Sequence, residues 1–203
     1  MIGSSQDELF EQVRRFLPPY LTSENKKDLF SELKKFPDKL NYFWDAPAEL
    51  RLQGDAWRPF TALKFEDGQR KQVTGIIVSN SCDIDASNER HFRANVLYAP
   101  LISMDRFAKR LSDLGLTLER VNDVLGSIRR QENTRVFYLP ASAQLPEALV
   151  QLDDIHGEPL DHFLANTGQR LFSLSQGGFY VFLIKLAIHF TRVQEGVSRT
   201  GTV

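Results

Sequence analysis

The order of helical and strand-like patterns limits the folds open to this chain of 203 residues. Apolar residues recur at helical spacing over residues 4–45 and again over 104–131, and a last apolar helix is expected near the C-terminus. Short runs of β-branched and aromatic residues predict strands at 73–78, 95–102, 136–140 and 149–155. Because strands and helices do not alternate regularly, the pattern argues against a doubly wound parallel sheet. The pattern predicts an α+β fold, a small and mostly antiparallel barrel with helical insertions.

Breaks in these patterns predict three parts. Residues 1–45 are expected to form an N-terminal helical pair, and residues 46–195 a barrel-like domain. The helical insertion at 104–131 and a packed C-terminal helix belong to that domain, and residues 170–174 are expected to lead into this last helix. Residues 196–203 are expected to form a flexible tail.

Charge, cysteine content and hydropathy exclude several classes of protein. The net charge is −1, from 25 basic and 26 acidic residues, which excludes a globally basic nucleic-acid binder but not a local basic patch. The single cysteine, Cys82, excludes a disulfide framework, and no Cys/His spacing indicates a metal site. No secretory signal is visible, and the most apolar stretch, 179–190, is shorter than the ~20 residues that span a bilayer. We therefore expect a cytoplasmic protein that binds no membrane, metal or cofactor.

A loop of small polar side chains over residues 79–91 is the surface most suited to a functional role, because a loop that leaves a buried strand can position such groups. One interpretation is a nucleophilic set of Cys82, Asp83 and His91, in which the imidazole generates a thiolate. Another is a divalent-metal site, although the Gly and Glu required in a calcium loop are missing. The alternative to both is a structural role, in which the aspartates accept hydrogen bonds from backbone N–H groups of the turn and the cysteine packs as a small core residue. The binding candidates are Asn80, Ser81, Cys82, Asp83, Asp85 and His91.

A basic surface is a further candidate. Residues 105–135 hold seven Lys or Arg against five Asp or Glu. Such a surface could contact phosphates, and the alternative is an ordinary mixed helix surface.

Three strand motifs resemble the PemK/MazF group of prokaryotic toxins. They are QGDAW at 53–57, GIIVSN at 75–80 and VLYAPLIS at 96–103. The resemblance covers about residues 51–103 and implies an SH3-like barrel. It also implies an endoribonuclease that needs no metal, a homodimer, and an antitoxin that covers the RNA site.

The chain departs from this family at the catalytic positions. Val73-Thr74 replaces the Arg-Pro that precedes the second apolar strand, and Ile102 replaces the Thr after the proline, which leaves Ser103 as the matching hydroxyl. Cleavage by 2′-OH attack needs a proton acceptor and a cation at the developing charge. The catalytic candidates are therefore the substitutes Arg58, Arg70 and Lys71, with Ser103 assisting.

Two functions follow from these observations. The first is a toxin-like or phage-defence protein that binds RNA or cleaves it. The second is a non-catalytic interaction module, or a subunit of a defence or toxin–antitoxin assembly, with an antitoxin or another defence protein as its partner.

Overall fold

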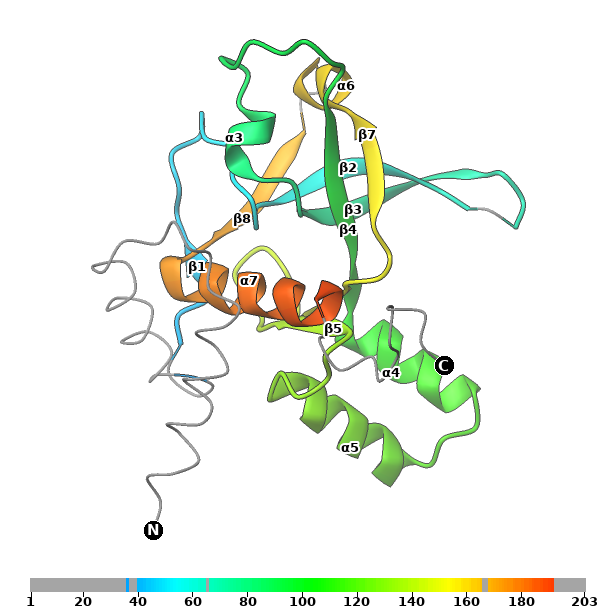
Figure 1. Ribbon diagram of the computed structural model, residues 1–203. Coiled ribbons are helices and arrows are strands. Elements are labelled where there is room, and N and C mark those ends of the chain that lie inside the picture. Colours follow the sequence, from blue (N-terminus) through cyan, green and yellow to red (C-terminus); the bar gives the residue numbers. More distant parts are fainter. Residues whose placement is uncertain (1–35, 37–39, 65, 166–167, 192–203) are drawn as a thin grey trace, which may run out of the picture.

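The computed structural model describes residues 36, 40–64, 66–165 and 168–191 and has an α+β architecture (Figure 1). In this part of the chain, eight strands form one sheet and five helices accompany it. Every strand pair is antiparallel, and the neighbours follow the path β1-β8-β2-β3-β4-β6-β5, with β7 paired to β4. The path is open, since its two ends do not pair. The predicted α+β class and the antiparallel pairing are thus confirmed.

The strands and helices follow one another in an irregular order. The strands are β1 (Phe43–Trp44), β2 (Ala56–Leu63), β3 (Arg70–Ile77), β4 (Asn95–Ser103), β5 (Val136–Leu139), β6 (Ala148–Gln151), β7 (His156–Pro159) and β8 (Gln169–Leu174). The helices are α3 (Ser81–Ile84), α4 (Met104–Asp113), α5 (Leu118–Arg129), α6 (Leu160–Ala165) and α7 (Gln176–Phe190).

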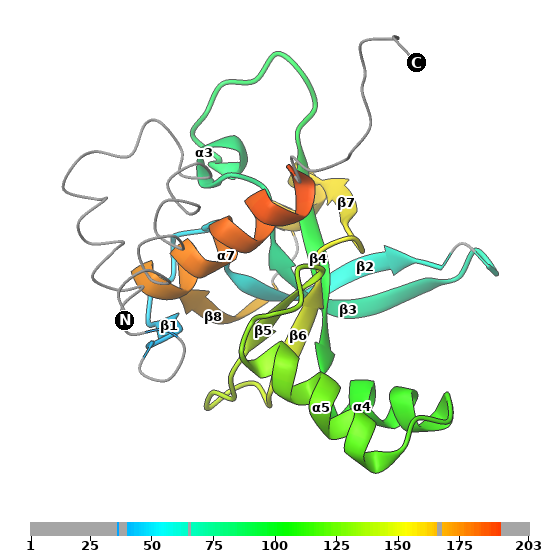
Figure 2. The same ribbon diagram turned by 60° about the horizontal axis from the view of Figure 1, so that its bottom comes forward.

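Strand β4 joins the two halves of the sheet. Its first residues pair with β7, its middle pairs with β3 through Gly75↔Pro100, and its last residues pair with β6. A strand that changes partners along its length must bend, and bent strands form the corners of strongly curved sheets. The chain then continues directly into α4, and the α4–α5 pair projects from the sheet in both views (Figures 1 and 2).

A close approach at Gly75 fixes the centre of the β2–β3–β4 ladder. The rings of Phe60 and Tyr98 stack there with centroids 4.0 Å apart. A Cβ at Gly75 would lie 2.8 Å from the Tyr98 ring and 2.9 Å from the Phe60 ring. The glycine therefore makes room for the aromatic pair.

The main core lies between the sheet and α7. It includes the buried side chains of Ile76, Phe137 and Phe182, and Phe182 tilts against Phe137 at 5.1 Å. A separate cluster that includes Val121, Leu125 and Ile128 attaches the α4–α5 pair to β5 and β6. Helix α7 is buried on several sides, as its almost uniformly apolar sequence requires.

Two short segments differ from the predicted pattern. Residues 43–44 form β1 instead of the end of a helix, and residues 169–174 form β8 instead of a lead into α7. Residues 175–178, which separate the apolar residues of β8 from those of α7, are the N-cap and first turn of that helix, so strand and helix follow each other without a loop. The remaining helical expectation for residues 1–45 lies almost wholly outside the described residues, as does the expected tail at 196–203.

A corner between α5, β5 and α7 is held by polar side chains. The side-chain amide of Gln131 donates to the Tyr138 carbonyl at 2.8 Å and accepts from the Tyr138 N–H at 3.0 Å. The Lys185 ammonium donates to the carbonyls of Gln131, at 3.0 Å, and Asn133. Burial lowers the pKa of Lys185 to about 8. Among the described helices, none has the length and apolar character needed to cross a membrane.

Candidate functional site

An irregularity in the β2–β3 ladder positions the candidate site. The pairs Trp57↔Gly75 and Phe60↔Val73 leave two β2 residues, Arg58 and Pro59, opposite the single residue Thr74. Two residues opposite one on the partner strand define a β-bulge, which bends the strand and redirects its side chains. The neighbouring strand β8 brings Gln169 opposite Arg58.

A shallow pocket of about 410 Å³ opens at this bulge. We call it the bulge pocket. Arg58 donates from Nε and Nη2 to the Gln169 amide oxygen at 3.1 and 2.6 Å. This partner is neutral, and Arg58 makes no ion pair with any residue that the structure describes. The residues that line the pocket are Arg58, Pro59, Gln72, Val73, Thr74 and Gln169.

The lining suits an anionic, hydrogen-bonding ligand. It combines one guanidinium, two amides and one hydroxyl with the apolar surface of Pro59 and Val73. Guanidinium groups are well matched to phosphate oxygens. The residues that line the pocket include neither a carboxylate nor an imidazole, so these side chains supply no general base. The pocket can therefore hold a phosphate without an evident means of cleaving a phosphodiester.

The other two predicted cations lie farther along the same hairpin. Arg70 and Lys71 pair with Leu63 and Ala62, near the tip, and both are exposed. Neither makes an ion pair with any residue that the structure describes. Strand alternation puts Arg70 on the same face of β3 as Gln72 and Thr74, whereas Lys71 faces the other way. Arg70 thus extends the positive charge beside the bulge pocket.

Ser103 belongs to a different part of the molecule. It ends β4, pairs with Ala148, and its hydroxyl accepts the Arg106 N–H at 3.3 Å as the N-cap of α4. It does not line the bulge pocket. No hydrogen bond or ion pair in the described residues joins it to Arg58, Arg70 or Lys71, so the structure does not bring the predicted catalytic set together.

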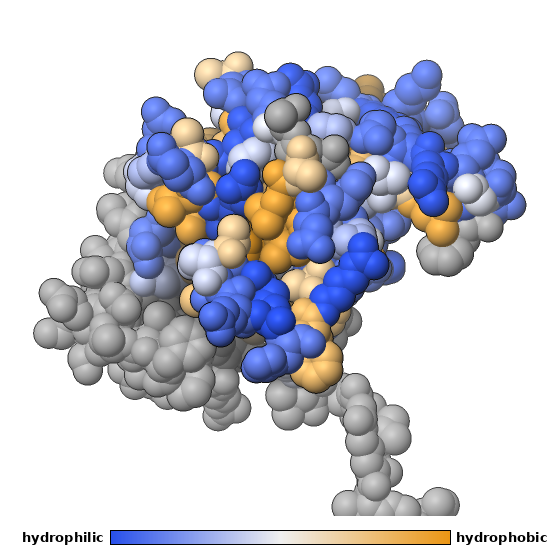
Figure 3. All heavy atoms as spheres, turned by 90° about the horizontal axis from the view of Figure 1, so that it is seen from above, coloured by the Kyte–Doolittle hydropathy of each residue, from blue (hydrophilic) through white to orange (hydrophobic). Residues whose placement is uncertain are grey.

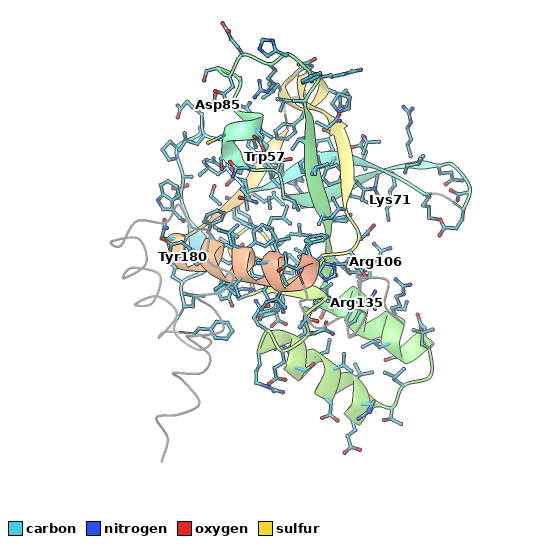
Figure 4. The ribbon with its side chains drawn as sticks, viewed as in Figure 1. Trp57, Lys71, Asp85, Arg106, Arg135 and Tyr180 are labelled. Carbon is cyan, nitrogen blue, oxygen red and sulfur yellow. The ribbon has the colours of Figure 1, made fainter. Side chains whose placement is uncertain are left out.

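The polar residues of the 79–91 loop mainly support the loop itself. Asn80 accepts the Cys82 N–H at 2.9 Å and caps α3, and Ser81 accepts the Gln53 N–H at 2.9 Å. Asp85 accepts the N–H and hydroxyl of Ser87, and these bonds lower its pKa. Figure 4 shows Asp85 well separated from Lys71 and Arg106.

The other three candidates in this loop do not form a connected site. Cys82, Asp83 and His91 are exposed, and no hydrogen bond links them within the described chain. Arg90 holds the loop by donating to the carbonyls of Asp83 and Asp85. No group of three metal-ligating side chains occurs anywhere in the described residues.

An exposed aromatic side chain directly after this loop was not among the residues predicted from the sequence. Phe92 is 88% exposed and lies between the exposed residues His91 and Arg93. An aromatic residue between two basic residues in a polar loop was the available signal. Figure 3 looks onto this end of the molecule, where hydrophilic residues cover most of the visible surface and hydrophobic ones form smaller groups.

The aspartate of the QGDAW motif has a supporting role. Asp55 is fully buried, accepts the Leu52 N–H at 3.0 Å and lies 3.7 Å from the Arg170 guanidinium. Burial raises its pKa, and nearby Ser173 and the Leu52 N–H oppose that shift. Since Arg170 and Ser173 belong to β8, this cluster holds β8 beside β2. It thereby positions Gln169 at the bulge pocket.

Comparison of the sequence with models of protein families and with curated proteins finds no match. Function is therefore inferred from the bulge pocket and its surroundings.

Proposed function

We propose that this chain is an RNA-binding, toxin-like or phage-defence protein related to the PemK/MazF group. The β2 bulge carries the proposal. It sets the dipeptide Arg58-Pro59 beside Val73-Thr74, the positions at which the resemblance would place an Arg-Pro. A guanidinium is thus available next to the expected place, supplied by the neighbouring strand.

Phosphate contacts dominate the affinity of most proteins for nucleic acid. Arg58 in the bulge pocket and Arg70 on the same face of the hairpin would supply such contacts. Exposed Phe92, with Arg93 beside it, offers a ring on which a base could stack. These groups support recognition of RNA by charge and stacking.

Binding without cleavage is favoured over the endoribonuclease. The residues that line the bulge pocket provide no proton acceptor, and Ser103 caps a helix elsewhere. The SH3-like barrel is a further part of this proposal, supported by the bend of β4 between its partners. A homodimer and an antitoxin or defence-protein partner rest on the resemblance alone.

Fluorescence anisotropy with a labelled single-stranded RNA, in low salt and EDTA, tests the proposal. The account predicts a saturable rise in anisotropy and an intact oligonucleotide on a denaturing gel. No binding at low salt would overturn it. Fragmentation that disappears in Arg58→Ala would replace the binding function by the endoribonuclease.

A further inference from the structure

A second pocket, of about 690 Å³, lies at the end of the sheet where β1 pairs with β8. Its volume falls within the roughly 300–1,000 Å³ that is typical of small-molecule sites. We call it the aromatic pocket, because four aromatic residues line it: Phe43, Trp44, Trp57 and Phe172. Gln169 lines this pocket as well as the bulge pocket, where it accepts from Arg58. The two pockets therefore adjoin at Gln169.

Trp44 provides the accessible aromatic surface of this pocket. It is 48% exposed, and in the described chain the ring contacts of β1 are made by its neighbour Phe43 instead. Trp57 is only 8% exposed, and the guanidinium carbons of Arg51 and Arg170 already lie 5.7 and 6.0 Å from its ring centroid. A planar group that enters the pocket would therefore stack on Trp44.

The charges of the aromatic pocket do not favour a phosphate inside it. Arg170 is the only cation of its lining and lies 3.7 Å from the buried carboxylate of Asp55. It also donates to the carbonyls of Leu50 and Pro47, both at 2.9 Å, so its charge and its donors are already engaged. Asp45, which also lines the pocket, is exposed and makes no ion pair within the described residues. The pocket therefore suits an uncharged planar group that carries N–H donors.

We infer that the aromatic pocket holds a base of the single-stranded RNA whose phosphate lies at Arg58. The inference rests on the proposed function and adds a stacking contact beside the phosphate contact. A base stacks on an aromatic side chain whatever its identity, and an acidic side chain accepts from the amino group of cytosine. Asp45 would accept in this way, whereas uracil presents a carbonyl oxygen at the same position. Stacking thus comes from Trp44, and a preference for cytosine over uracil comes from Asp45.

Tryptophan fluorescence tests this inference directly, because both tryptophans of the chain, Trp44 and Trp57, line the pocket. Labelled oligo(C) RNA is titrated into the full chain at low salt, and its anisotropy is followed in parallel. Tryptophan emission should be quenched with the same midpoint as the rise in anisotropy. Trp44→Ala should weaken RNA binding about tenfold, whereas Trp44→Phe should retain most of the affinity because it keeps a ring for stacking.

Further comparisons separate stacking from charge. An oligonucleotide of abasic sites keeps the phosphates and lacks the bases, so the parent and Trp44→Ala should bind it equally, which also shows that the variant is folded. The salt dependence of oligo(C) binding should be the same in Trp44→Ala as in the parent, because stacking neutralises no phosphate. The matched control is Phe190→Ala, which removes a ring that is 59% exposed at the end of α7 and should leave RNA affinity unchanged.

The base preference has its own comparison. The parent should bind oligo(C) more tightly than oligo(U), and Asp45→Ala should reduce this difference. Equal affinity of the parent for the two oligonucleotides would contradict the part assigned to Asp45.

Two results would overturn the base site while leaving RNA binding intact. One is a rise in anisotropy without a change in tryptophan emission, and the other is an unchanged RNA affinity in Trp44→Ala. A different result would overturn the proposed function itself, and the base site with it: no rise in anisotropy with either oligonucleotide at low salt.

Discussion

At the scale of single residues, Gln131 closes one edge of the sheet. Strand β5 pairs with β6 on one side, and on the other the Gln131 amide bonds both the N–H and the carbonyl of Tyr138. An unpaired strand edge invites pairing with another chain, so a side chain that occupies it protects the fold. The same residue provides a carbonyl for Lys185, which links this edge to α7.

We expect Gln131→Ala to lower the free energy of unfolding by ~1–3 kcal/mol, because two half-buried backbone groups lose their partner. Urea denaturation followed by circular dichroism measures the change. The matched control is Gln144→Ala, in an exposed loop, which should leave stability within ~0.5 kcal/mol of the parent. Equal stability of both variants would show that the amide does not support β5.

Lys185 predicts a dependence of stability on pH. Its pKa is about 8 in the folded protein, against an ordinary value of 10.5, because burial disfavours the charged form. Between these values the unfolded chain binds more protons, so stability should rise as the pH increases through this window. Denaturation midpoints measured across the window should show the rise, and Lys185→Met should lack it. The same rise in the variant would assign the effect to another group.

At the scale of elements, local periodicity predicted most of the long segments. The strands β3 and β4 and the helices α4, α5 and α7 follow runs whose apolar spacing is unambiguous. Strand β7 has the sequence His-Gly-Glu-Pro, which carries no strand signal, and it forms because β4 offers an edge to pair with. Such segments are specified by distant partners, which a local pattern does not contain.

The contact of α7 with the chain before β1 depends on Gly178. A Cβ at this position would lie 2.5 Å from the Tyr42 carbonyl oxygen and 3.1 Å from its Cα, both backbone atoms. We expect Gly178→Ala to lower the free energy of unfolding by ~1–3 kcal/mol, because the helix must move away. Urea denaturation monitored by tryptophan fluorescence measures it.

Gly126 in α5 provides the matched control. A Cβ there would meet only the flexible end of Arg130, at 3.3 Å, so Gly126→Ala should gain up to ~1 kcal/mol from helix propensity. Destabilisation by both substitutions to a similar extent would contradict this account of α7.

At the scale of the whole molecule, a net charge of −1 hides an uneven distribution. In the described residues Arg58, Arg70 and Lys71 of the β2–β3 hairpin make no ion pair, whereas Arg129, Arg130 and Arg135 each pair with a carboxylate. Overall charge therefore argues against a general nucleic-acid binder, while the β2–β3 hairpin remains open to an anionic partner.

Only part of the candidate site could be predicted from the sequence. Arg58 and Arg70 were identified as cations near the barrel motifs. The pocket also needs Thr74, which a bulge places, and Gln169, which lies 111 residues beyond Arg58 in the chain. Ladder irregularities and long-range pairing leave no local trace. Ser103, which the resemblance favoured, is occupied as a helix cap.

The most direct test of the account is RNA affinity as a function of salt for Arg58→Gln and Arg130→Gln. Both variants lose one positive charge, but Arg130 is already neutralised by Glu132. The account predicts that Arg58→Gln weakens RNA binding. It also predicts that the negative slope of log K against log salt becomes shallower by ~0.7, the value for one phosphate contact to a single strand. Arg130→Gln should change neither. An equal loss in both variants, or no loss in Arg58→Gln, would contradict a phosphate site in the bulge pocket.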